Sequence, residues 1–339
     1  MDAYDYPLPE AAIAQSPVEP RDAARLLVAT EADGADSAVA HHTVRDLPEL
    51  LGAGDVLVVN DTRVVPARLH LCKATGGRVE VVLLERLNGD TWEALVRPSA
   101  RVPSGTRLLA GDQELLEVNG TGGEGTRHVR VLNPIEDSDL ESWATLALPP
   151  YIHRPLADPD RYQTVYATNP GSVAAPTAGL HLTEGVLEAC RSRGVEVHAV
   201  DLTVGLGTFR PVSAERPEDH VMHPERYRVP ETTMEACRRA ARVVAVGTTT
   251  VRALESAAAT GDLQGRTSLF IHGEYPFRVV DALLTNFHVP RSSLLVLLDA
   301  FCGDRWRELY RLALGDGYRF LSFGDAMLVS RRPAGGGRA

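Results

Sequence analysis

The sequence predicts an α/β protein into which a smaller all-β domain is inserted, and three observations carry this prediction. Residues 150–330 alternate between helical segments and short apolar runs, which is typical of an α/β sheet domain. Residues 66–148 contain short strand-like runs separated by glycine-containing turns and no helix, which favours a small barrel or sandwich. The chain has 339 residues, above the usual size of one domain, so we expect two.

The composition is that of an ordinary globular protein, with 44% hydrophobic and 24% charged residues. No apolar run is long enough to cross a bilayer, and Met1 to Glu10 lack the features of a secretory signal. The four cysteines lie far apart without a Cys-x-x-Cys pair, so we expect free buried thiols in a reducing cytoplasm. The net charge of −10 argues against a general electrostatic grip on nucleic acid. Local basic patches remain compatible with it, since Arg97, Arg101 and Arg107 are closely spaced.

The first segment, residues 1–65, ends in a buried strand. Residues 26–28 form a short apolar strand, and residues 44–51 have helical spacing. The continuous apolar run 56–59 predicts a strand that is buried on both faces. It is followed by the tetrapeptide Asn60-Asp61-Thr62-Arg63, and open α/β sheets place their sites at the carboxyl ends of such strands. The tetrapeptide is therefore either part of a site or an ordinary turn.

The inserted domain is expected over residues 66–148, with the remainder of the large domain at 149–330. Its strands are predicted at residues 78–84, 91–96, 107–109, 114–118 and 127–132.

The elements of residues 149–330 follow from helix-end and strand signals. Helices are expected at residues 183–193, 232–241, 251–259, 294–301 and 306–314, and strands at 195–203, 243–246 and 283–287. Thr183 provides a start for the first of these helices and Gly194 an end, while Ser292 and Ser293 can cap the helix at 294–301. The tail 331–339 is rich in Gly and Arg, and we expect it to be disordered.

Two loops combine glycine with polar side chains. In Pro170–His181, glycine permits unusual backbone angles and proline forbids most angles. Together these residues specify one defined loop conformation. The loop contains Thr177 and ends in His181. The second loop, Thr203–Arg210, contains Gly205, Gly207 and Thr208. It lacks the third glycine of a dinucleotide fingerprint, so it supports a close backbone approach to a ligand more than a nicotinamide site.

Two further segments follow apolar runs. Gly247 to Arg252 forms a strand-to-helix junction, where Thr248, Thr249 and the backbone amides suit a carboxylate or phosphate, or else merely cap the helix. Asp281 to Arg291 is the densest polar cluster after an apolar run, with Thr285, Asn286 and His288.

Other catalytic signatures are missing from the sequence. There is no Gly-x-Ser-x-Gly elbow and no phosphate-binding Walker loop. His220 and His223 form a His-x-x-His pair, but Pro224 interrupts the element and no carboxylate stands at a helical offset. We therefore expect no metal.

Eight segments in order make the chain resemble the S-adenosylmethionine:tRNA ribosyltransferase-isomerases of queuosine biosynthesis. The resemblance runs from about Tyr6 to Leu328 and is carried by residues 21–28, 54–63, 148–154, 161–166, 170–181, 205–211, 247–255 and 281–291. It differs mildly at Leu182, where an aromatic residue is usual, and at Thr250 and Ala24, where serine is expected. None of these differences removes a charged or proton-transferring group.

The resemblance implies a large mixed α/β domain with a small inserted antiparallel β-barrel, and a transferase-isomerase that uses S-adenosylmethionine as ribosyl donor, without a cofactor. The acceptor it implies is 7-aminomethyl-7-deazaguanine at the wobble position of a tRNA, and the products are epoxyqueuosine-tRNA, adenine and methionine. We expect a monomer in the cytoplasm.

That chemistry assigns hypothetical roles to the candidate residues. His181 and His288 are candidates for proton transfer, and Asp281 for balancing the sulfonium charge. Thr248, Thr249 and Arg252 are expected to hold the methionine carboxylate, and the loop at Gly205, Gly207 and Thr208 to receive adenine or ribose. The remaining substrate-binding and tRNA-binding candidates are Thr177, Thr285, Asn286, Arg63, Arg154 and Arg291.

Two alternatives stay open at this point. A diverged relative could use S-adenosylmethionine with another acceptor, and it would then be active without tRNA. A tRNA-binding module without catalysis would need phosphate contacts, which the net charge of −10 disfavours.

Overall fold

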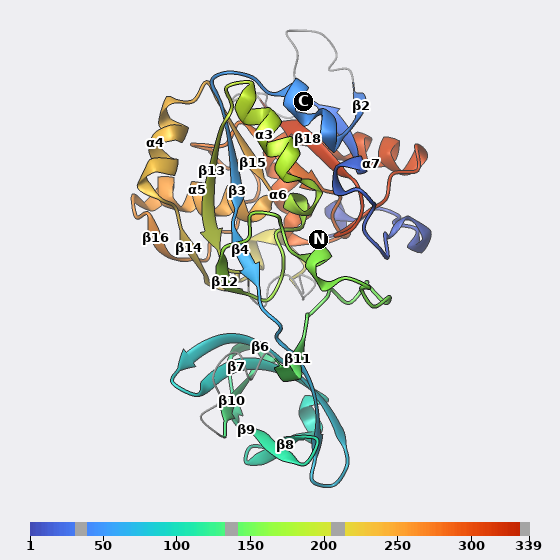
Figure 1. Cartoon of the computed structure of the whole chain (residues 1–339), viewed down its shortest axis with the longest axis vertical. Coiled ribbons are helices and arrows are strands. Elements are labelled where there is room, and N and C mark those ends of the chain that lie inside the picture. Colours follow the sequence, from blue (N-terminus) through green and yellow to red (C-terminus); the bar gives the residue numbers. More distant parts are fainter. Residues whose placement is uncertain (31–38, 133–141, 205–213, 333–339) are drawn as a thin grey trace. The chain divides into compact units, whose positions relative to one another are not determined.

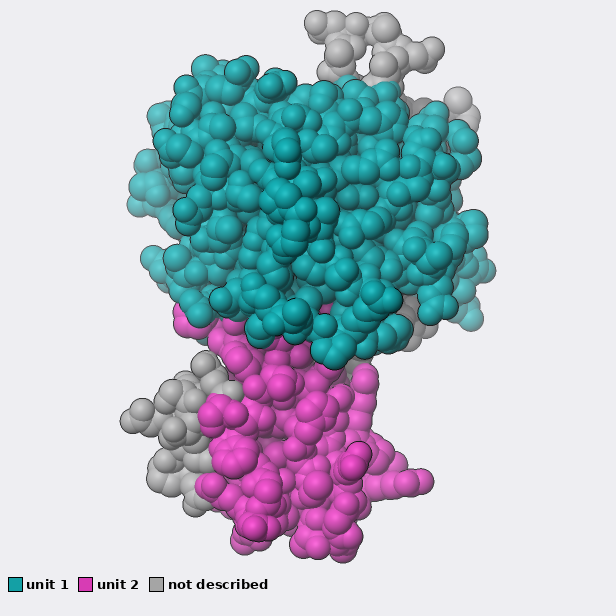
Figure 2. Space-filling view, turned by 45° about the vertical axis from the view of Figure 1, so that its right-hand side comes forward, with its two compact units in different colours: residues 1–63, 150–169, 175–339 teal, residues 64–149, 170–174 magenta. Residues whose placement is uncertain are grey.

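The computed structural model describes residues 1–30, 39–132, 142–204 and 214–332 (Figure 1). The chain divides into two compact units (Figure 2). The large unit comprises residues 1–63, 150–169 and 175–339, and the small unit comprises residues 64–149 and 170–174. From the sequence we predicted these boundaries after residues 65 and 148. No sequence pattern indicated that residues 170–174 belong to the small unit. Of the tail expected to be disordered, residues 333–339 lie outside the described residues.

A mixed β-sheet forms the centre of the large unit, as the sequence predicted. Within the described residues its strand order is β16-β14-β13-β3-β15-β17-β18-β1-β2. The bounds are β1 Arg25–Ala29, β2 Ala40–Thr43, β3 Asp55–Asn60, β13 Glu196–Leu202, β14 Glu225–Arg228, β15 Arg242–Val246, β16 Gln264–Thr267, β17 Ala282–Asn286 and β18 Ala326–Ser330. The neighbours β13, β3, β15 and β17 are parallel, so their carboxyl ends meet at one edge. The short strands β4 (Thr62–Val64) and β12 (Asn169–Ser172) pair with each other.

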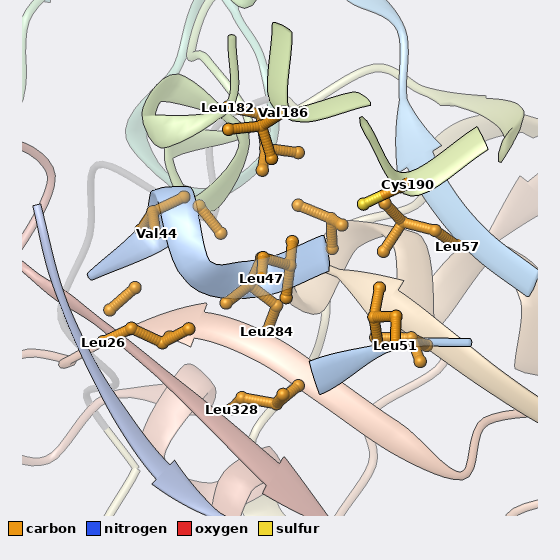
Figure 3. Packing of buried hydrophobic residues seen from close by; sticks show 14 of the residues in the cluster. Leu26, Val44, Leu47, Leu51, Leu57, Leu182, Val186, Cys190, Leu284 and Leu328 are labelled. Carbon is orange, nitrogen blue, oxygen red and sulfur yellow. The ribbon is translucent and has the colours of Figure 1, made fainter. Parts of the chain in front are cut away.

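Both faces of this sheet are covered. On one face, α1 (Leu47–Leu50) and α3 (Glu184–Ser192) pack onto alternate residues of the strands, such as Leu57 and Leu284 (Figure 3). Side chains alternate along a strand, so Asn60 belongs to the other face. There its Nδ2 donates to Oγ1 of Thr249 at 3.2 Å, which places the start of α5 on that face. Every residue of β3 is buried, as the continuous apolar run predicted.

Most helix ends agree with their sequence signals. The remaining helices are α4 Glu231–Arg239, α5 Thr248–Thr260, α6 Ser293–Cys302 and α7 Arg305–Gly315. Thr183 caps α3 by accepting from the Val186 amide, and Ser292 caps α6 by accepting from the Leu295 amide. The start of α5 was expected at residue 251, but it begins three residues earlier, directly after Gly247.

The small unit is a closed antiparallel barrel within the described residues, which decides between the barrel and the sandwich. Its strands are β5 Arg68–Lys73, β6 Arg78–Asn88, β7 Thr91–Arg97, β8 Thr106–Ala110, β9 Gln113–Thr121, β10 Arg127–Val131 and β11 Ala144–Thr145. The order is β11-β5-β6-β7-β10-β9-β8, and β8 also pairs with β5, which closes the barrel. The sequence did not indicate β5 and β11.

All four cysteines are free, and Cys190, Cys237 and Cys302 are buried as expected. Cys72 is exposed, so the expectation that it is buried is wrong. Side chains along β5 point alternately inward and outward, and that of Cys72 points outward. Among the described residues, no helix combines the length and apolar character that a membrane span requires.

Candidate functional site

A cavity lies in the large unit beside the carboxyl ends of the parallel strands. Its volume is about 180 Å³, against roughly 10–15 Å³ for one water molecule, so it has room for a small organic ligand. Thr248, Thr249 and Arg252 of α5 line it together with residues 289–294 and the apolar segment 269–271. The cavity therefore combines one polar corner with a mostly apolar wall.

The amino end of α5 forms part of the polar corner. Gly247 has a φ of 86° and turns the chain from β15 into the helix, and no side chain of the described residues caps the helix end. The amides of a first helical turn lack partners within the helix, and the helix dipole makes this end positive. A carboxylate or phosphate would be stabilised here. Thr248 and Thr249 line the cavity at this end, and their role in binding stays a prediction.

Arg252 completes this corner and is itself buried, with 5% of its surface exposed. Its Nη1 donates to the equally buried Glu225 carboxylate, and its Nε donates to the carbonyl of Leu269 at 3.0 Å. Its Nη2 is buried and has no hydrogen-bond partner. A buried donor without a partner costs about 1–3 kcal/mol, which an acceptor atom of a ligand would recover.

His181 lies on the other face of the sheet, next to the end of β17. Its Nε2 is 3.0 Å from Nδ2 of Asn286, and that amide nitrogen also donates to the carbonyl of Leu321 at 3.2 Å. Because the carbonyl can only accept, the amide nitrogen must point this way, so the Nε2 of His181 accepts and its proton sits on Nδ1. Burial, and then the nearby charges of Arg319, Arg161 and Arg21, lower the pKa of His181 to about 4.

His288 is equally buried but pairs with Thr285, whose Oγ1 is 3.2 Å from the His288 Nε2. Burial lowers the pKa of His288 to about 3. Thr285 and Asn286 are consecutive in β17, so their two histidine partners lie on opposite faces of the sheet. At neutral pH both imidazoles are uncharged, and neither lines the cavity. Their role in proton transfer stays a prediction.

Asp281 lies at the opposite edge of the sheet. Its carboxylate accepts from the Val243 amide at 2.9 Å and from Nη2 of Arg331 at 3.3 Å. Five residue steps at about 3.3 Å each separate it from Asn286, a distance of roughly 17 Å. Asp281 therefore joins the starts of β15 and β17 and contributes no charge to the cavity, which corrects its predicted role.

The other predicted residues are placed unevenly. Thr177 begins a short 3₁₀ helix, Thr177–His181, and is half-buried. Arg63 and Arg154 are exposed, whereas Arg291 lines the cavity and pairs with Asp2 at 3.3 Å. Gly205, Gly207 and Thr208 lie outside the described residues.

Sequence reasoning missed Glu225, the wall at residues 269–271 and Arg319. Each depends on contacts distant in the chain, and a lone glutamate after His223 and Pro224 gives no local signal. Among the described residues, no group of three or more histidine, cysteine or acidic side chains is arranged to hold a metal ion.

Comparisons with known proteins cover nearly the whole chain. A family model described as queuosine biosynthesis protein matches residues 1–329. An S-adenosylmethionine:tRNA ribosyltransferase-isomerase from Rubrobacter xylanophilus is 50% identical over 339 residues, which is 100% of this chain and 98% of that relative. A Thermus thermophilus protein of the same name is 51% identical over 97% of this chain and 99% of its own length.

A solved structure is similar as well. The crystal structure of S-adenosylmethionine tRNA ribosyltransferase from Thermotoga maritima is 38% identical and covers 96% of this chain and 99% of that chain. The TM-score of 0.55 indicates a shared fold.

Proposed function

This chain belongs to the queuosine biosynthesis protein family and is a transferase-isomerase, and on that premise we propose its substrates and products. The ribosyl part of S-adenosylmethionine is transferred to the aminomethyl group of 7-aminomethyl-7-deazaguanine at the wobble position of a tRNA. The sugar rearranges, epoxyqueuosine forms in the tRNA, and adenine and methionine are released.

The observation that supports this proposal is the polar corner of the cavity. The methionine end of the donor carries a carboxylate, which suits the amino end of α5 and the unpaired Nη2 of Arg252. The methylene groups between the carboxylate end and the sulfonium are apolar, as is the wall that includes Leu269, Ile271 and Leu297. In this arrangement the cavity holds the methionine end of the donor.

The electrostatics restrict which groups transfer protons. The sulfonium acidifies the neighbouring 5′ carbon, so a base must remove a proton there, and adenine leaves more easily when a ring nitrogen is protonated. His181 and His288 are neutral above pH 5 because their pKa values are about 4 and about 3. We therefore propose that they act through their hydrogen bonds, His181 with Asn286 and His288 with Thr285.

The test is a reaction of the purified protein with S-adenosylmethionine and tRNA that carries 7-aminomethyl-7-deazaguanine. The modified nucleoside at the wobble position is identified by mass spectrometry, and the released adenine is measured by a separate assay. Epoxyqueuosine together with adenine is the expected result. Adenine without a modified tRNA would indicate a different acceptor, and neither product from folded protein would contradict the proposal.

We further propose that the enzyme acts as a cytoplasmic monomer without a cofactor. The four free cysteines agree with a reducing compartment. Light scattering after size-exclusion chromatography measures the oligomeric state directly.

A further inference from the structure

The small barrel gathers cations at one of its ends. Burial alternates along its strands, which shows the side chains that point outward. In β5 the residues Leu69 and Leu71 are buried, and in β6 the residues Val79 and Val81 are buried. Arg78 of β6 and Arg97 of β7 consequently lie on the outer surface, and both are exposed.

Strand register brings these cations together. Cys72 is paired with Arg78, and Glu80 is paired with Arg97, so Arg78 and Arg97 are diagonal neighbours about 7–8 Å apart. Lys73 ends β5 on the inward side of the strand, with Leu69 and Leu71. Its Nζ donates to the carbonyl of Arg101 at 3.1 Å, so these two residues lie together at the end of the barrel where β6 begins. We call Lys73, Arg78, Arg97 and Arg101, which gather at the end of the barrel where β5 ends and β6 begins, the basic face.

Little negative charge lies within the basic face. Glu80 of β6 is an acidic neighbour of these cations. Its carboxylate is 3.7 Å from Nε of Arg68 and 4.0 Å from Nη1 of Arg97. Arg68 and Arg97 share Glu80, whereas Lys73, Arg78 and Arg101 form no ion pair within the described residues. Such a concentration of positive charge contrasts with the net charge of −10 for the whole chain.

A buried arginine holds part of the basic face in position. Arg127 is 7% exposed, and its Nη1 donates to the carbonyl of Val102 at 2.8 Å while its Nε donates to that of Gly120 at 2.8 Å. The segment that carries Arg101 is thereby tied to β9. A surface that is ordered before binding loses less entropy when a ligand arrives.

We propose that the basic face binds the phosphate backbone of an RNA, which under the proposed function is the substrate tRNA. Arginine side chains match phosphate groups with paired donors, and cations spread over neighbouring strands suit a row of phosphates. A protein partner would require an apolar centre. The exposed large apolar side chains of the described residues are Leu87, Trp143, Val165, Val221 and Val289, and none belongs to this surface.

The test compares two variants with the same change in net charge. Arg78→Glu/Arg101→Glu alters the basic face, and Arg238→Glu/Arg311→Glu alters exposed positions on α4 and α7. Fluorescence anisotropy of labelled tRNA over a series of KCl concentrations gives the dissociation constant and its salt dependence. Loss of two phosphate contacts should lower the slope of log K against log salt by about 1.5 and weaken binding about tenfold or more.

The matched variant should remain within about threefold of the wild type, because screening limits the effect of distant charges to roughly 10 Å. Arg78→Lys/Arg101→Lys keeps the charge and should retain most of the affinity. Equal affinity and slope for the two charge-reversed variants would overturn the proposal, as would an absence of tRNA binding by the wild type.

The outcomes also separate this proposal from the proposed function. Salt-dependent binding that the Arg78→Glu/Arg101→Glu variant loses, without any modified wobble base from the wild type, supports the basic face and contradicts the reaction. Wobble modification with an unchanged KM for tRNA in that variant supports the reaction and overturns the basic face. The rise in Tm on adding S-adenosylmethionine shows that each variant is folded.

Discussion

At the scale of single residues, buried polar atoms without partners separate candidate binding groups from structural ones. Arg252 Nη2 and Asn286 Oδ1 are both buried and unpaired, whereas the carboxylate of Asp281 has two partners. Native proteins pair the large majority of their buried polar atoms. Arg252 lines the cavity, so its unpaired donor is a candidate partner for a ligand carboxylate.

Replacing Arg252 with lysine tests this interpretation. Arg252→Lys keeps one positive charge near Glu225 but removes Nη2. A hydrogen bond to a charged group contributes about 1.5–3 kcal/mol, so the affinity for S-adenosylmethionine should fall roughly 10- to 100-fold. Titration calorimetry measures the dissociation constant, with Arg238→Lys on exposed α4 as the control. An unchanged dissociation constant in the folded variant would remove Arg252 from the site.

The lowered pKa of His181 predicts a dependence of stability on pH. The unfolded chain protonates this histidine near pH 6.5, but the folded chain does so only near pH 4. Its contribution is thus complete above pH 6.5 and is lost as the pH falls toward 4. Between pH 7.5 and pH 5.0 the wild type should lose about 2 kcal/mol through this group.

His181→Gln removes the titration and retains an acceptor for Asn286. Urea unfolding at the two pH values should show a loss smaller by about 2 kcal/mol in this variant than in the wild type. His153→Gln, at an exposed position, is the control. If His181→Gln and the wild type lose the same stability, the imidazole is not held neutral by burial.

At the scale of elements, the position of α5 depends on the backbone of Gly247. Its φ of 86° is unfavourable for any residue with a Cβ, although a Cβ would meet no atom closer than 3.7 Å. With ψ at 154° this backbone conformation is essentially restricted to glycine, so Gly247→Ala should destabilise the protein by about 1–3 kcal/mol through strain alone. By displacing the start of α5, it should also weaken S-adenosylmethionine binding.

Gly261 offers a matched control at the other end of the same helix. Its φ is 82°, and a Cβ there would meet nothing within 4 Å. The helix has 13 residues, so about 20 Å separate Gly261 from the cavity end. Gly261 is in the left-handed helical region, with ψ at −7°, so Gly261→Ala should lose about 1–2 kcal/mol in urea unfolding but keep its affinity. An equal loss of affinity in both variants would disprove the link between Gly247 and the site.

Elements with strong local patterns could be predicted from the sequence, and elements defined by distant pairing could not. The apolar run of β3 and the caps of α3 and α6 follow from neighbouring residues. The strand β18 pairs with β1 and β17 from other parts of the chain, and β14 contains the buried Glu225. A charged residue such as Glu225 interrupts the apolar pattern by which a strand is predicted. Its burial is explained only by its ion pair with Arg252, which is 27 positions away in the chain.

The same reasoning explains the errors at the site. The segment Asp281–Arg291 was treated as one polar cluster, but it contains the five-residue strand β17. The two ends of a strand lie at opposite edges of a sheet, so Asp281 and Asn286 could not meet. Burial lowers the pKa of both histidines. For His181 the charges of Arg319, Arg161 and Arg21 lower it further, and no local sequence pattern places them beside His181.

At the scale of the whole molecule, the two compact units have separate hydrophobic interiors and separate proposed ligands. The lining of the cavity belongs to the large unit, and the basic face belongs to the small unit. A ligand stabilises the part of a protein that it binds. Each ligand should therefore stabilise mainly its own unit, which is the usual behaviour of domains with independent cores.

The three tryptophans allow this prediction to be tested unit by unit. Trp92 and Trp143 lie in the small unit, and Trp306 is buried in the large unit. The variant Trp92→Phe/Trp143→Phe reports on the large unit, and Trp306→Phe reports on the small one. At 100 times its dissociation constant, S-adenosylmethionine should stabilise the large unit by about 2.7 kcal/mol in fluorescence-detected urea unfolding and leave the small unit nearly unchanged. Equal stabilisation in both reporters would mean that the units unfold as one cooperative structure, because binding to one part then stabilises the whole chain.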